Sequence, residues 1–195
     1  LPPTQTETMT TDVAEAPKMV QRKLQATAAP ETVFAYVFPI KDAEVSYGSS
    51  HHDYQASDIF CPEGSSFVAV TSGVVTIVFS EDKWNPENDD PALRSGLAVG
   101  ILGDDGVQYY GSHLSAVAEG VNIGMRVQAG DLLGYTGRSG NARGTPPHLH
   151  FGISRPSAPD DWRIRRGEMN PYEFLNAWRE GVSMQPIFAE TPAEG

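Results

Sequence analysis

Two histidines stand one residue apart in the stretch TPPHLHFGIS, which runs from Thr145 to Ser154. The stretch is predicted to be a β-strand, in which residues two apart project to the same face. His148 and His150 therefore point together, while Leu149 and Phe151 point to the other face and can pack in a core. Two imidazoles side by side on a sheet can both bind a metal ion, or one can bind it while the other carries protons.

The other histidines lie in two similar places, so that all five fall in three small clusters at predicted strand ends. His51 and His52 precede Asp58 in HHDYQASD, and His113 lies near the end of the predicted strand YYGSHLS. A zinc ion set for hydrolysis typically takes three nitrogen or carboxylate ligands and leaves one position for water. The ion lowers the pKa of that water, and spare histidines can take and return its proton, which is worth about 10²–10⁴-fold in rate. These residue types predict a metal-dependent hydrolytic site.

Four segments in one order resemble the lysostaphin-type, LytM-like zinc endopeptidases of the M23 family, which cut peptide crosslinks in bacterial cell walls. The segments are HHDYQASDIFCPEGSSFVAVTSGVV, YYGSHLSAV, GMRVQAGDLLGYTGRSG and PPHLHFGIS. The resemblance covers roughly residues 47–154, and several separate motifs in the same order are more specific than any one of them.

The resemblance implies one Zn²⁺ ion, and this chain has a suitable residue at each ligand and catalytic position of the family. Carried over by position, the metal ligands fall on His52, Asp58 and His150, and the two catalytic histidines on His113 and His148. The family's usual first motif is His-x-x-x-Asp, whereas five residues separate His52 from Asp58 here. His52 is the expected ligand, because HDYQASD fits a longer form of that loop, and His51 stays an alternative.

From Phe34 onward, short apolar runs are separated by Gly, Asp and Pro, a pattern that predicts a strand-rich domain. Asn170 and the PYEFLNAWREG that follows it predict one short C-terminal helix, with an N-cap, an early proline and a terminating glycine. The expected fold is mainly β, an antiparallel, sandwich-like single domain, and the resemblance makes it a barrel-sandwich hybrid. The predicted strands are SFVAV, GVVTIVF, LAVGILG, VQYYGSHLS, DLLGYTG and HLHFGIS.

The domain boundaries follow from composition. Residues 1–33 are rich in Thr, Pro, Ala and Glu and are expected to form an N-terminal linker or arm. Residues 34–182 are expected to form the domain that the resemblance identifies as an M23-like metallopeptidase, and residues 183–195 a C-terminal tail.

Two long irregular stretches, residues 80–96 and 137–147, are expected to border the site, since long loops in compact domains are often functional. Arg138, Asn141 and Arg143 in the second stretch are candidates to meet carboxylates or carbonyls of a substrate. No substrate-binding residue is assigned.

The net charge of −11 excludes the basic field that nucleic acids and anionic membranes require. Cys61 is the only cysteine, which excludes an internal disulfide and a cysteine-built zinc site. No apolar run approaches the ~20 residues of a membrane helix. The sequence begins at Leu1 rather than Met, which fits a removed signal segment or anchor and a location outside the cell, in the periplasm or at the cell envelope.

The function expected from these observations is hydrolysis of stem or cross-bridge peptides of peptidoglycan by metal-activated water. The alternative is a non-catalytic M23-like module that regulates cell-wall enzymes or joins a protein partner in a surface assembly. Because no ligand or catalytic histidine is missing from the motifs, an enzyme is favoured.

Overall fold

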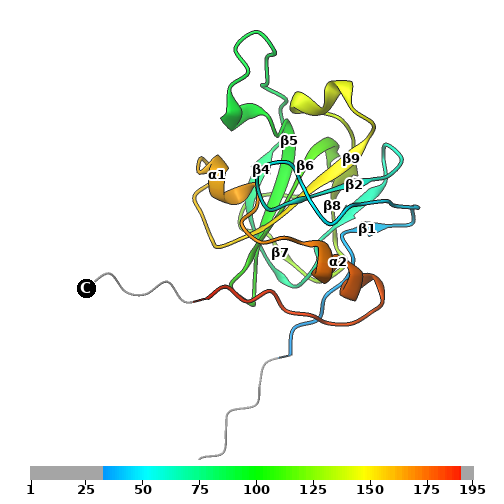
Figure 1. Ribbon diagram of the computed structural model, residues 1–195. Helices are drawn as coiled ribbons and strands as arrows, with labels where there is room; N and C mark the ends of the chain where they lie inside the picture. Colours follow the sequence, from blue (N-terminus) through cyan, green and yellow to red (C-terminus); the bar gives the residue numbers. More distant parts are fainter. Residues whose placement is uncertain (1–32, 190–195) are drawn as a thin grey trace, which may run out of the picture. The chain divides into compact units, whose positions relative to one another are not determined.

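The computed structural model describes residues 33–189 (Figure 1). The predicted arm, residues 1–33, lies outside the described residues except for Val33, and so do residues 190–195 of the predicted tail.

The described chain forms nine strands whose pairs are all antiparallel. The strand order is β1-β3-β8-β6-β5-β4-β7, and β9 pairs with β6 on one side and with β2 on the other. The mainly antiparallel β domain predicted from the sequence is thereby confirmed. The strands are β1 Ile40–Lys41, β2 Ser57–Phe60, β3 Ser66–Val68, β4 Gly73–Phe79, β5 Leu97–Gly103, β6 Gln108–Val117, β7 Arg126–Val127, β8 Leu132–Thr136 and β9 His148–Ser154.

Each of the six predicted strand sequences corresponds to a strand of the structure, namely β3, β4, β5, β6, β8 and β9, and β6 runs two residues beyond its predicted end. The sequence did not predict β1, β2 and β7, which are only two to four residues long. Runs this short show too little alternation of apolar and polar residues to be distinguished from loops. Pairing with neighbouring strands, rather than their own sequence, makes them strands.

The helices of the described chain are α1 (Trp162–Arg165) and α2 (Tyr172–Arg179), and none has the length and hydropathy of a membrane span. The C-terminal helix predicted from the sequence is α2. It begins as expected, since the Asn170 side chain accepts a hydrogen bond from the Tyr172 amide at 3.0 Å. Two short 3-10 turns lie in the long loops, η1 (Pro91–Leu93) and η2 (Gly140–Gly144).

Helix α2 closes the core by packing Leu175 and Trp178, both buried, against aromatic side chains. The Trp178 ring stacks on Tyr36 with centroids 5.3 Å apart and meets Tyr109 and Phe151 edge-on at 6.1 and 6.3 Å. Burying aromatic surface stabilises the fold, and the paired rings add to it. The apolar side of β9 is therefore fixed to the core, and the side chains that alternate with it must face the opposite side of the strand.

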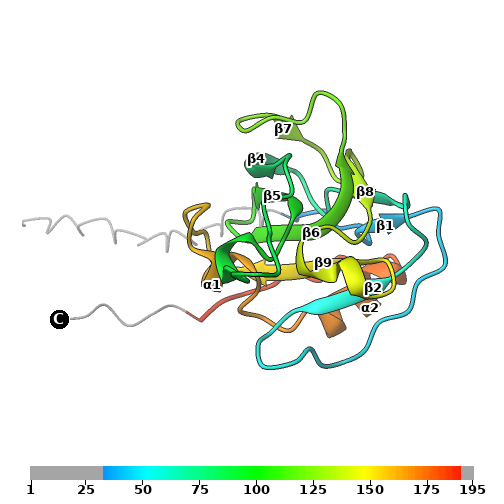
Figure 2. The ribbon, with the colours of Figure 1, turned by 90° about the horizontal axis from the view of Figure 1, so that it is seen from above.

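The loops at residues 80–96 and 137–147 project from the same end of the sheet (Figure 1). Figure 2 shows β6, β9 and β2 side by side, in agreement with their pairing. This end of the three strands carries the candidate site.

Candidate active site

Strand pairing brings Asp58 and His150 together. In the antiparallel pair of β2 and β9, Asp58 lies directly opposite His150. Leu149 and Phe151 are fully buried in the core, so His148 and His150, which alternate with them, face the other side of the strand. Three polar side chains from two strands thus share one face, and the alternation in β9 predicted this for its two histidines.

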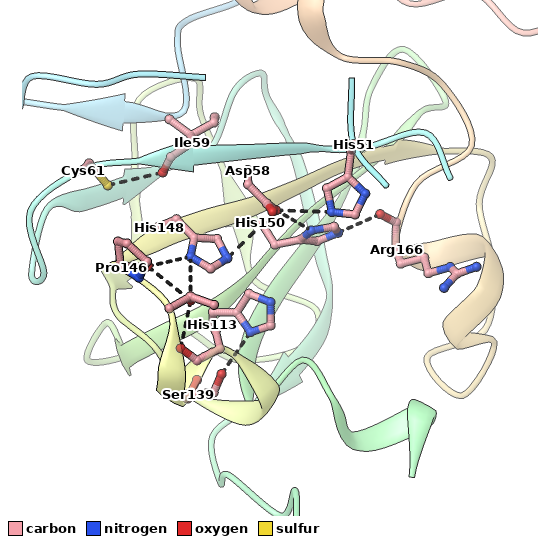
Figure 3. A network of polar contacts seen from close by, with 12 residues as sticks. His51, Asp58, Ile59, Cys61, His113, Ser139, Pro146, His148, His150 and Arg166 are labelled. Atoms are coloured by element: carbon pink, nitrogen blue, oxygen red, sulfur yellow. Dashed lines mark hydrogen bonds and ion pairs between the residues drawn. The ribbon is translucent and has the colours of Figure 1, made fainter. Parts of the chain in front are cut away.

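His51, Asp58 and His150 form the tightest group of ligand-type atoms, all within 4.8 Å of one another. Figure 3 shows the group: the Asp58 Oδ1 lies 3.0 Å from the His150 Nδ1 and 3.4 Å from the His51 Nε2. His51 belongs to the loop that precedes β2, and its side chain is only 5% exposed. The structure thus gathers two imidazoles and one carboxylate at one point.

The structure places His51, the alternative, beside Asp58 and His150, and leaves His52, the expected ligand, outside that group. His52 begins a turn and is exposed, and its ring meets the His51 ring edge-on at 4.8 Å. Tyr54 packs on the other side of His51 at 4.4 Å between ring centroids. Consecutive residues at a turn point in different directions, so only one of the two histidines can face inward.

Two neighbours fix the proton of His150 and the charge of Asp58. The His150 Nε2 lies 3.0 Å from the backbone carbonyl of Arg166, and a carbonyl only accepts, so Nε2 carries the proton and Nδ1 offers a lone pair. Burial alone would raise the pKa of Asp58, but hydrogen bonds and charges from His150 and His51 outweigh it and hold this pKa well below its usual range. The hydrogen bond from His150 to Asp58 requires a second proton, on Nδ1. When Nδ1 carries no proton, it and the Asp58 Oδ1 are two acceptors 3.0 Å apart, an arrangement that suits a metal ion.

His113 and His148 lie beside this group, buried at 8% and 4% exposure, with their rings 5.0 Å apart. The Nδ1 of His113 lies 2.9 Å from the carbonyl oxygen of Ser139, and the Nδ1 of His148 lies 2.9 Å from that of Pro146. By the same reasoning both Nδ1 atoms carry the proton, and both Nε2 atoms can accept one. Burial, reinforced by the charges of His150 and His148, lowers the pKa of His113 to about 3, so this ring is neutral at pH 7.

A break in strand pairing orients His113. Strand β6 pairs with β9 as far as Ser112 and with β8 from Leu114, and the register against β5 shifts at the same point. His113 sits in this bulge with a φ of 63°, a conformation that costs a non-glycine residue roughly 1–2 kcal/mol. Bulges turn a side chain away from regular alternation and recur next to active sites.

All of these side chains line one cavity of about 310 Å³. Both long loops contribute to it, through Arg94 and Ser95 of residues 80–96 and through Asn141 of residues 137–147. The loops are tied together by Asp82, which accepts hydrogen bonds from the Gly140 amide at 2.9 Å and the Arg143 guanidinium at 2.8 Å.

Of the three candidate substrate contacts, Asn141 lines the cavity, whereas the two arginines are engaged elsewhere. Arg143 pairs with Asp82, and Arg138 lies 3.5 Å from Glu63. One further group was not predicted from the sequence: the guanidinium of Arg166, just after α1, lies over the rings of Tyr54 and Trp162. Its signal is the basic run RIRR in an otherwise acidic chain.

Comparison with known proteins places this site in context. A family model described as peptidase family M23 matches residues 52–162. The L-Ala–D-Glu endopeptidase of Bacillus subtilis (strain 168) is 28% identical over 158 residues, covering 74% of this chain and 43% of that protein. The glycyl-glycine endopeptidase ALE-1 of Staphylococcus capitis is 32% identical over 106 residues, covering 53% of this chain and 24% of that protein.

A solved structure shows the same fold. LytM from Ruminococcus gnavus ATCC 29149 superimposes with a TM-score of 0.59 at 27% identity, covering 76% of this chain and 62% of that chain. The present chain spans less than half the length of the two curated relatives.

Proposed function

We propose that this chain, which belongs to peptidase family M23, is a zinc-dependent endopeptidase acting on the peptides of peptidoglycan. One observation carries the proposal: three metal-ligand side chains and two histidines with available Nε2 atoms line the same cavity. The endopeptidase names of the Bacillus subtilis and Staphylococcus capitis relatives support the reaction class.

His51, Asp58 and His150 would hold the ion. Two imidazole nitrogens and one carboxylate oxygen are ligands that zinc accepts in catalytic sites. The lone pair of the His150 Nδ1, which faces an ionised carboxylate at 3.0 Å, fits a cation between them. A bound Zn²⁺ supplies a Lewis acid for the scissile carbonyl and lowers the pKa of water.

His113 and His148 would act on the attacking water. Each holds its own proton on Nδ1 against a carbonyl and offers the lone pair of its Nε2. His148 would accept a proton there, and His113, whose pKa of about 3 keeps it neutral, would accept a hydrogen bond that orients the water. The imidazolium formed in this way donates to the leaving amine and returns to its neutral state.

The substrate implies a location. Peptidoglycan lies outside the cytoplasm, so we place the protein at the cell envelope, in the periplasm or outside the cell. The non-catalytic alternative has no specific observation in its favour in the part of the chain that the structure describes.

The test is the release of new amino termini from purified cell walls by the zinc-loaded protein. The His113→Ala variant should keep its zinc and lose about 10²–10⁴-fold in rate, because the group that orients the attacking water for proton transfer is removed while the ligands stay. Removing zinc with a chelator and adding it back should abolish and restore the activity. No new amino termini from walls with either glycine or direct crosslinks would refute the proposal.

A further inference from the structure

Arg166 lines the cavity without an acidic partner among residues 33–189. Its guanidinium carbon lies 3.8 Å from the centroid of the Tyr54 ring and 5.0 Å from that of Trp162. Its Nε is buried and has no hydrogen-bond partner. Buried polar groups are normally paired, so the unpaired Nε shows that the described residues leave the hydrogen-bonding capacity of this guanidinium unmet, in a residue that lines the cavity.

The preceding residue adds a second positive charge to the same wall. Arg165 is 4% exposed, and its guanidinium donates to the carbonyls of Pro159 and Ala92 at 2.9 and 2.8 Å and to the hydroxyl of Tyr110 at 3.3 Å. None of these partners neutralises its charge. This wall is therefore positive in a chain whose net charge is −11, and a cavity strengthens such a local field.

Arg166 is also fixed relative to the candidate metal ligands. Its backbone carbonyl accepts the His150 Nε2–H at 3.0 Å, and the Tyr54 ring beneath its guanidinium packs on His51 at 4.4 Å. A guanidinium stacked on an aromatic face keeps its edge available, and this edge presents paired N–H donors that match a carboxylate.

We propose that Arg166 binds a carboxylate of the substrate close to the scissile peptide bond. The nature of the ligand as a peptide rests on the proposed peptidase function, whereas the carboxylate is inferred from Arg166 itself. A glutamate residue in a stem peptide carries such a group and an internal glycine of a bridge does not. Arg166 therefore selects carboxylate-bearing stem peptides over glycine bridges.

The experiment compares two synthetic peptides, L-alanyl-γ-D-glutamyl-L-lysine with its glutamate α-carboxylate free and the same peptide with that group amidated. Calorimetric titration into the zinc-free full chain measures binding without hydrolysis. The wild type should bind the free acid about 10–100-fold more tightly, as a charge-assisted hydrogen-bond pair provides. Arg166→Gln should remove this preference, and Arg166→Lys should keep only part of it. Arg179→Gln, an exposed change of equal charge on α2 and outside the cavity, is the matched control and should bind as the wild type does.

The proposal is overturned if the wild type binds neither peptide, binds both equally, or if Arg166→Gln keeps the full preference. If circular dichroism shows that Arg166→Gln does not fold, Arg166→Lys serves as the test instead. If Arg166→Lys prefers the free acid as strongly as the wild type does, the proposed paired contact of Arg166 with the carboxylate is wrong. Absence of cleavage of any wall or peptide by the zinc-loaded protein refutes the peptidase function. The binding comparison remains readable in that case, so the two failures are distinguishable.

Discussion

Gly152 on β9 leaves the space through which the Arg166 carbonyl reaches His150. A Cβ at position 152 would lie 2.5 Å from the Arg166 carbonyl oxygen and 2.7 Å from its carbon, whereas ordinary contact begins at 3.4 Å. In Gly152→Ala the carbonyl must therefore retreat by about 0.9 Å. A retreat away from His150 would lengthen the hydrogen bond from its Nε2, now 3.0 Å, to at most about 3.9 Å, which is beyond hydrogen-bond range.

The expected effect is a loss of metal affinity with every ligand intact. Losing a hydrogen-bond partner that orients a ligating histidine typically costs about 10–100-fold in metal affinity. Gly152→Ala should show a loss of this size in zinc competition against a chromophoric chelator. Gly144→Ala, where no atom lies within 4 Å of the added Cβ, is the matched control and should bind zinc as the wild type does.

Thermal unfolding in excess chelator separates this effect from damage to the fold. A Gly152→Ala protein that folds and binds zinc as tightly as Gly144→Ala would refute the role given to the Arg166 carbonyl. This role would also be refuted if the loss of zinc affinity in Gly152→Ala were fully explained by a lower stability of the zinc-free protein.

Three further predictions concern the ligands, pH and the core. His51→Ala should weaken zinc binding by about 10²–10³-fold, roughly one ligand's share of a zinc site, while His52→Ala changes it little, as measured by chelator competition. A larger loss in His52→Ala than in His51→Ala would restore His52 as the ligand. In excess chelator, the free energy of unfolding should be highest above about pH 6.5 and fall as the pH drops toward about 3. In this range His113 takes up a proton in the unfolded chain, whereas burial keeps it neutral in the folded protein. Urea unfolding at a series of pH values should show a shallower fall in His113→Gln, and an identical fall would contradict the assignment. Trp178→Ala should lower the free energy of unfolding by about 3–5 kcal/mol in urea, since it empties the contact between α2 and the sheet, and a loss below about 1 kcal/mol would contradict that packing.

The parts of the site that lie within a regular strand could be read from the sequence. The alternation in HLHFGIS places His148 and His150 on one face because Leu149 and Phe151 occupy the core, and the structure has this arrangement. Local alternation is a property of the strand itself, so it survives without knowledge of the rest of the chain.

The parts that depend on irregular backbone or distant pairing could not be read in this way. The choice between His51 and His52 depends on the direction of a turn, which spacing alone does not give. His113 owes its orientation to a bulge where β6 changes partners, and Arg166 meets His150 through a loop sixteen residues away in sequence. Each of these is fixed by tertiary contacts rather than by local preference.

The carbonyls of Ser139 and Pro146 both belong to the loop at residues 137–147, and Asp82 fastens that loop to residues 80–96. A graft of the second loop alone, from a relative with another preference, would disturb the tautomers of His113 and His148 together. Loop exchange in this scaffold should therefore treat the two loops as one cassette, transferred with Asp82 and its Gly140 contact intact.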